Sequence, residues 1–126
     1  MKLGTLLLVN AIIALGFGIG FTVAPAQVLA PYGMSLSAPG LVIARLFGTA
    51  LLGYGVLTWL LRAATDPAAL RAVCLSLAIS DAVGAVVAAM GVLGGHVNAL
   101  GWSTVALYAG LGIGFASFAM RKAPVS

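Results

Sequence analysis

The chain has 126 residues, of which 63% are hydrophobic and only 6% are charged, whereas a typical globular protein has about 25% charged residues. A surface of this composition would not stay soluble, and apolar runs longer than about 18 residues indicate membrane-spanning helices. The formal net charge is +4, but in a membrane protein such an excess reports orientation rather than affinity for nucleic acid. The composition predicts an all-α protein embedded in a lipid bilayer, with no nucleic acid as partner.

The first apolar segment begins near residue 3 and ends near residue 24. An uncharged, proline-containing stretch follows up to about Gly40, where we expect a loop with room for a short interfacial turn. The segment could also be a secretory signal, because Lys2 precedes it and the small residues Ala24-Pro25-Ala26 follow it. Its apolar run of about 21 residues exceeds the roughly 7–15 residues of a signal core, so a membrane helix is the preferred interpretation.

Three further apolar segments follow. The second is interrupted only by Arg45, and the third is preceded by Asp66-Pro67, which is typical of a helix start with Asp as the cap. The fourth ends at Arg121-Lys122. We expect one integral membrane domain over residues 1–126, a four-transmembrane-helix bundle with helices at about residues 3–24, 41–61, 70–93 and 100–120.

The basic residues predict the orientation of the bundle. With an even number of spans, five of the six basic residues fall on one side of the membrane, and neither connection on the other side contains Lys or Arg. Basic residues favour the cytoplasmic side, so we expect a multi-pass protein of the inner (cytoplasmic) membrane with both termini in the cytoplasm (N-in, C-in). The five residues are Lys2, Arg62, Arg71, Arg121 and Lys122.

A faint internal repeat relates the two halves of the chain. Residues 52–62 align with residues 111–121, and residues 10–14 align with residues 81–85, although the two matches need different offsets. A tandem duplicated helical hairpin would explain both matches. Chance similarity among Gly-, Ala- and Leu-rich helices explains them equally well.

Asp81 is the most informative single residue, because it lies near the middle of the third apolar segment. An ionised carboxylate there costs a few kcal/mol or more, so it must be protonated, paired or in contact with water, and should face the bundle interior. Arg45, near the outer end of the second helix, is the obvious charged partner. Pairing with Asp81 and snorkelling of Arg45 to the outer head groups are equally open alternatives.

Other polar side chains lie at a similar expected depth. They could form one buried polar layer around Asp81, either as functional groups or as interhelical hydrogen bonds worth about 0.6 kcal/mol each. The functional candidates are Asn10, Tyr54 and Tyr108, and Thr49 and Ser80 complete the layer.

The chain has seventeen glycines, most of them within the four segments. Small residues let helix backbones approach closely, so we expect tight helix packing rather than phosphate binding, for which glycines would have to follow a strand. The expected packing positions are Gly16, Gly20, Gly48, Gly53, Gly84 and Gly112.

The chain offers few groups for catalysis or metal binding. It has two acidic residues, one His and one Cys, so no nucleophile, base and orienting group can be assembled and no metal site is expected. His96 is expected in an outer loop, and Cys74 is expected to be buried and inert. The protein is therefore not predicted to be an enzyme, and no cofactor is indicated.

The run from Ala44 to Gly53, Ala-Arg-Leu-Phe-Gly-Thr-Ala-Leu-Leu-Gly, follows a proline-containing first loop. In this run and in its layout the chain resembles small four-helix bacterial membrane proteins of the DoxX-like type. The resemblance implies the bundle but carries over no catalytic residue. Two functions stay open. The preferred one is a non-catalytic accessory subunit that packs into a larger membrane complex, against other membrane proteins or a second copy of itself. The alternative is a homo-oligomeric small transporter or channel that uses Asp81 and Arg45.

Overall fold

A computed structural model describes residues 1–121 of the chain, and the regular elements of this part are all helical, without strands. Four helices are long and apolar enough to cross a membrane, which confirms the prediction of an all-helical membrane protein with four spans. Lys122 lies outside the described residues. The elements are α1 (Leu3–Val23), α2 (Pro25–Leu29), a 3-10 turn η1 (Ala30–Tyr32), α3 (Ala38–Leu61), α4 (Pro67–Leu93) and α5 (Gly101–Ala119).

Two helices begin earlier than the apolar runs indicate, because local start signals rather than hydropathy set their first residue. The Ser37 hydroxyl accepts a hydrogen bond of 3.3 Å from the backbone N–H of Gly40, and Pro39 fits the first turn, so α3 starts at Ala38. α4 starts at Pro67 directly after Asp66, the position that the Asp-Pro pair indicates, but the Asp66 side chain does not make the capping hydrogen bond expected of it. The expected first loop contains α2 and η1.

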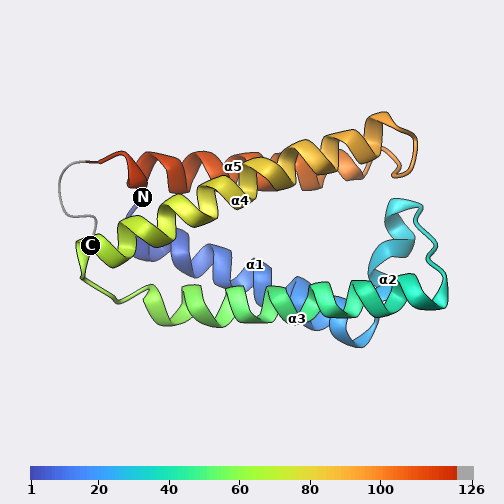
Figure 1. The fold of residues 1–126 in the computed structure, drawn as a ribbon, viewed down its shortest axis with the longest axis horizontal. Coiled ribbons are helices and arrows are strands. Elements are labelled where there is room, and N and C mark those ends of the chain that lie inside the picture. The colour runs from blue at the N-terminus through green and yellow to red at the C-terminus, as the bar shows by residue number, and fades with distance from the viewer. Residues whose placement is uncertain (122–126) are drawn as a thin grey trace.

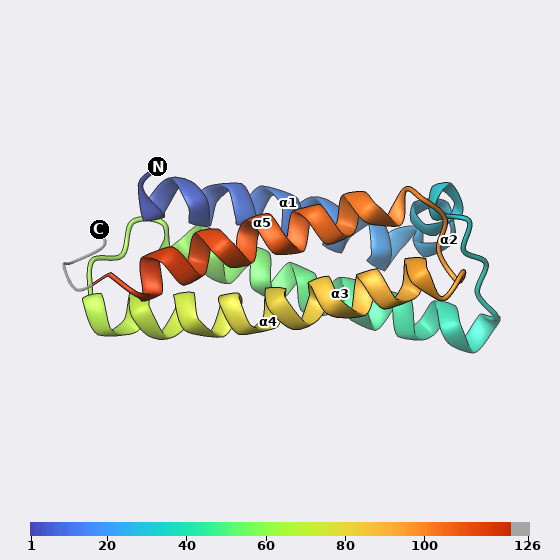
Figure 2. The ribbon, with the colours of Figure 1, turned by 90° about the horizontal axis from the view of Figure 1, so that it is seen from above.

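The four long helices are arranged as two pairs. α1 packs along α3, and α4 packs along α5. Figure 1 shows that the pairs lie close together at the end where α1 begins and α5 ends, here called the terminal end. They diverge toward the opposite end, the far end, where α2 lies, and Figure 2 shows all four helices running along the same long axis.

Glycines form the contact within the α1–α3 pair. A Cβ atom at Gly48 would lie 2.6 Å from the backbone nitrogen of Thr22, and one at Gly18 would lie 2.9 Å from the backbone nitrogen of Leu52. Gly55 lies equally close to Leu15. The two helices can therefore approach this closely only because these positions lack side chains.

The other expected packing glycines divide into two groups. A Cβ at Gly84 would lie 2.7 Å from the Tyr108 ring, and one at Gly112 would lie 3.1 Å from the Asp81 Cβ, so both mark the α4–α5 contact. Gly20 lies against Val28 of α2. Gly16 and Gly53 contact nothing within 4 Å of an added Cβ, so these two positions do not pack helices of this chain together.

The apolar core lies at the terminal end, where the two pairs meet. It is formed by α1, α4 and α5, and Phe115 at its centre is fully buried. These side chains close the bundle at this end. The buried members are Leu3, Leu6, Leu7, Leu70, Cys74, Leu77, Phe115, Phe118 and Ala119.

Candidate functional site: a cavity between the two helix pairs

The inward-facing stripe of α4 changes its character at Asp81. Leu70, Cys74 and Leu77 are buried in the terminal core, and Asp81 is the next buried residue of the helix. Further along the same stripe, seven and ten residues after Asp81, stand the small residues Ala88 and Gly91. The stripe therefore has large side chains on one side of Asp81 and little to fill the interior on the other.

A cavity of about 580 Å³ occupies this second half of the bundle. Its volume lies within the roughly 300–1,000 Å³ of small-molecule sites, and like them it has mostly apolar walls with a few polar groups. All four long helices contribute to it, together with Leu29 of α2, Tyr32 of η1 and the loop around His96.

Although Tyr32, His96 and Thr104 line the cavity elsewhere, most of its polar groups gather where it meets the terminal core. Each long helix contributes there: Asn10 from α1, Tyr54 from α3, Asp81 with Ser80 from α4, and Tyr108 from α5. The Tyr54 hydroxyl donates a hydrogen bond of 3.4 Å to the Ser80 hydroxyl, which links the two helix pairs. The structure thus brings together the three functional candidates and Asp81, a set here called the polar floor.

Asp81 is the most constrained member of the polar floor. Its side chain is 8% exposed, and its Oδ2 atom is buried without a hydrogen-bond partner among the described residues. A buried carboxyl group without a partner is destabilising. The position therefore favours a bound group that can hydrogen-bond to the carboxyl oxygen.

The structure does not bring Arg45 to Asp81. Arg45 is exposed on α3 and is not among the residues lining the cavity, and no ion pair joins the two within residues 1–121. The neighbouring helical positions explain this: Ala44 and Gly48 face α1 and are buried, which turns Arg45 outward. Of the two alternatives, this placement agrees with snorkelling to the head groups.

Two hydroxyl side chains differ from the expected polar layer. Thr49 is exposed, and its hydroxyl donates to the carbonyl oxygen of Leu46 on its own helix. Thr58, which the sequence reasoning missed, is fully buried and accepts a hydrogen bond of 3.4 Å from the Asn10 amide. The spacing of four residues from Tyr54 places both on one face of α3 and could have indicated Thr58.

The far end of the cavity is held by the loop between α4 and α5. The Asn98 side chain donates a hydrogen bond of 2.9 Å to the carbonyl oxygen of Pro31, and its backbone N–H donates to Tyr32. Gly33 adopts a positive φ of 74° beside this contact. The loop between α4 and α5 is thus fixed to η1, which belongs to the connection between α1 and α3.

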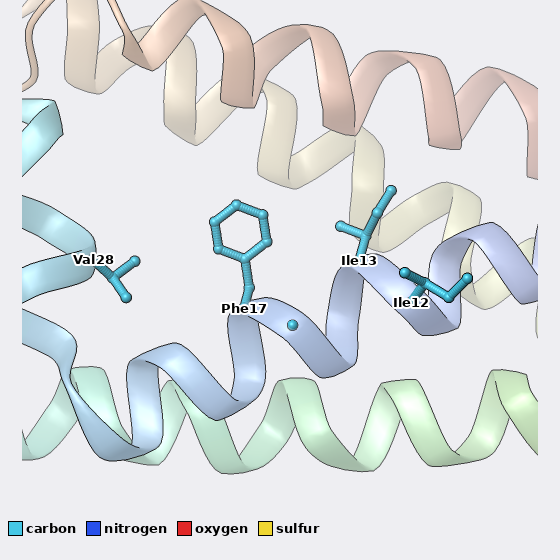
Figure 3. A pocket seen from close by; sticks show the side chains of 5 residues that line it. Ile12, Ile13, Phe17 and Val28 are labelled. Carbon is cyan, nitrogen blue, oxygen red and sulfur yellow. The ribbon is translucent and has the colours of Figure 1, made fainter.

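A second, smaller pocket of about 320 Å³ lies on the surface of α1 beside α2. Figure 3 shows Ile13 and Phe17 pointing from α1 toward the α4–α5 pair, with Val28 of α2 facing Phe17. Ile13 and Phe17 also line the large cavity, so they form a wall shared by both. Gly16 leaves open space on the pocket side.

The large cavity is not closed off from its surroundings. Two of its lining side chains, Phe47 and Val87, are 42% and 61% exposed. Lipid, water or another small molecule can therefore enter it from outside.

The arrangement contains no recognisable metal site, since no group of three or more His, Cys, Asp or Glu side chains is found among the described residues. Comparisons of the chain with protein-family models, with curated proteins and with solved structures gave no significant match. The resemblance to DoxX-like proteins stays a prediction from the sequence. The cavity is the feature of the structure that bears on function.

Proposed function

We propose that this protein binds a lipophilic small molecule inside the membrane, with a polar head group of the molecule at the polar floor and its apolar part along the cavity toward the far end. The carrying observation is the combination of a large, mostly apolar cavity with a cluster of polar side chains from all four long helices at one end, which includes the only acidic residue that lines it among the described residues. Such a distribution matches an amphiphile better than bulk water or a plain hydrocarbon chain. The proposed function is binding, without catalysis.

The length of the cavity bounds the length of the ligand. From Asp81 to Gly91, the last cavity residue of α4, the helix rises roughly 15 Å at about 1.5 Å per residue. A molecule with about ten extended carbons and a small head group has roughly this length. The expected ligand is therefore shorter than a whole phospholipid.

Filling the cavity tests the proposal. Ala88 lines the cavity, whereas Val86 on the same helix is 61% exposed on the outside. We expect Ala88→Phe to expel a bound molecule and Val86→Phe to leave it in place, because only the first ring enters the cavity. Protein reconstituted in nanodiscs is extracted with organic solvent, and the extract is compared by mass spectrometry with that of empty nanodiscs.

The expected result is a molecule enriched in the wild type and the Val86→Phe variant and absent from the Ala88→Phe variant. Equal extracts from both variants, or no enrichment in the wild type, would contradict the proposed function. Size-exclusion profiles of the two variants verify that both are folded.

We also propose that both termini face the cytoplasm of a cell with an inner membrane. Four described basic residues support this orientation, because Lys2, Arg62, Arg71 and Arg121 all belong to the terminal end. The test uses single cysteines in a Cys74→Ser background. A membrane-impermeant reagent applied from outside should label cysteines at Ser35 and Ala99 but not at Thr65.

The arrangement as two helix pairs also supports an origin by duplication of a hairpin, since each pair is formed by helices adjacent in the chain apart from α2 and η1. The test is superposition of the two pairs: a duplication requires residues 52–62 and 111–121 to fall on equivalent positions.

An accessory subunit is the second candidate function. Its support is that Gly16, Gly53 and Gly110 have open space around an added Cβ and so pack against no other helix of this chain. Outward glycines would let a helix of another protein, or of a second copy, approach closely. Purification in mild detergent tests this: a partner held by such a contact should be lost from a Gly53→Leu variant.

If the protein is a transporter or channel, its path through the membrane cannot use both Asp81 and Arg45, the pair expected from the sequence. Arg45 lies outside the cavity, so Asp81 would have to act without it. Flux measured in liposomes with wild type and Asp81→Asn at matched reconstitution distinguishes transport from binding alone. Wild-type flux that disappears in the variant would favour transport.

A further inference from the structure

The cavity wall has a potential negative charge and no fixed positive charge among the described residues. Among the described residues that line it, Asp81 is the one acidic side chain, and none is Lys or Arg. His96 is the one imidazole, and it belongs to the far-end loop, beyond the end of α4. The wall next to the polar floor therefore carries one potential negative charge and no fixed positive charge.

The protein's own cations do not neutralise this carboxyl group. Arg45 is exposed outside the cavity, and the Arg71 Nε donates a hydrogen bond of 2.9 Å to the carbonyl oxygen of Ala119 at the terminal end. Arg71 precedes Asp81 by ten residues in α4, a rise of roughly 15 Å. The unpartnered Oδ2 of Asp81 thus lacks a counter-charge from within residues 1–121.

Aromatic rings form much of the remaining wall. Six of the lining side chains are aromatic, and Phe21 of α1 meets Phe47 of α3 edge to face at 5.2 Å between ring centroids. Aromatic rings attract cations that lie over their faces, most strongly when water is excluded. The six residues are Phe17, Phe21, Tyr32, Phe47, Tyr54 and Tyr108.

We propose that the ligand of this cavity is a lipophilic monovalent cation of the ammonium type, with its nitrogen beside the Asp81 carboxylate and its apolar part among the aromatic rings. The inference rests on the proposed function and adds the chemical class of the ligand. A cation supplies the missing counter-charge of Asp81, and its charge lies next to Tyr54 and Tyr108, the two aromatic rings of the polar floor. An anion would instead meet an unpaired carboxylate, and a neutral chain would leave that carboxylate buried and uncompensated.

The experiment compares three probes with the same alkyl chain: decyltrimethylammonium, decyl sulfate and decanol. Each is titrated by calorimetry below its micellar concentration into wild-type protein in nanodiscs of uncharged lipid, and the signal of empty nanodiscs is subtracted. We expect saturable binding of the cation at least about tenfold tighter than that of the sulfate or the alcohol, as for other charge-assisted contacts.

Variants localise the effect. Asp81→Asn keeps the size of the side chain and removes its charge, so it should weaken cation binding by about tenfold to a hundredfold and change decanol binding far less, since the amide can still hydrogen-bond to a hydroxyl. Ala88→Phe should abolish binding of all three probes, since it removes the space. Val86→Phe is the matched control and should behave as the wild type.

The outcomes separate the two proposals. Equal affinity for cation, sulfate and alcohol, with all three lost in Ala88→Phe, would overturn the cation inference and keep the proposed function. Absence of saturable binding of any probe would contradict both. Tighter binding of the alcohol than of the cation would also overturn the inference, and would indicate that Asp81 is a neutral hydrogen-bond donor. The wild-type comparison decides between these even if Asp81→Asn does not fold.

Discussion

The two halves of the bundle use the same helices but reach different packing. At the terminal end, Leu3 and Leu7 of α1 meet Phe115 of α5 in a closed core. Farther along the same face of α1, Asn10 and Ala14 line a cavity of about 580 Å³. Helix formation is equally good in both halves, so the size of the side chains on the inward stripes decides whether the two pairs close on each other.

The largest difference in the free energy of unfolding should come from removing one aromatic ring in each half of the bundle. Phe115 is 0% exposed in the core, whereas Phe47 is 42% exposed and lines the cavity. We expect Phe115→Ala to lower the free energy of unfolding by about 3–5 kcal/mol and Phe47→Ala by less than about 1 kcal/mol, because only the first opens a new cavity. Unfolding in mixed micelles of mild detergent and SDS measures both, and similar losses would show that the two halves are equally packed.

The next largest difference in the free energy of unfolding should be between a glycine at the contact within a helix pair and a glycine on the open surface. A Cβ at Gly48 would lie 2.6 Å from Thr22, but one at Gly53 on the same helix would contact nothing. We expect Gly48→Ala to lower the free energy of unfolding by about 1–3 kcal/mol through overpacking. Gly53→Ala should raise it by up to about 1 kcal/mol, since alanine favours the helix. Equal effects of the two substitutions would mean that the α1–α3 contact is not set by glycine.

The sequence predicts the helices well because a membrane span is a local property. Twenty or so apolar residues satisfy their own backbone hydrogen bonds as a helix, whatever their neighbours are. The starts of α3 and α4 depend on Ser37 and Pro67, which are local signals as well. Burial of Asp81 also follows from a local argument, the high energy of a carboxylate in lipid.

The sequence does not predict which helix faces touch. Gly16 and Gly20 have the GxxxG spacing, yet the α1–α3 contact uses Gly18, because rotation of each helix is determined by all its contacts together. Arg45 faces outward for the same reason, since Ala44 and Gly48 are the better packing surface. The sequence does not reveal the cavity, because its wall is formed by side chains from several helices together.

Asp81 stands at the border between the two halves, so its replacement should extend the core. We expect Asp81→Leu to raise the free energy of unfolding by about 1–2 kcal/mol in the absence of added ligand, because an unpaired buried carboxyl group is exchanged for an apolar side chain. Val83→Leu, at a position 59% exposed on the same helix, is the control and should change little. A loss of stability in Asp81→Leu would mean that the carboxyl group already has a stabilising partner, and would weaken the case for a ligand there.

The smallest effect should come from the hydrogen bond that crosses the polar floor between the two pairs. The Tyr54 hydroxyl lies 3.4 Å from the Ser80 hydroxyl, a long contact, and interhelical hydrogen bonds in membranes contribute about 0.6 kcal/mol on average. We expect a coupling energy of about this size from a cycle of Tyr54→Phe, Ser80→Ala and the double variant, measured in mixed micelles. Because both variants leave the apolar contacts of the terminal core in place, a coupling of more than about 2 kcal/mol would show that the polar floor, rather than the core, holds the two helix pairs together.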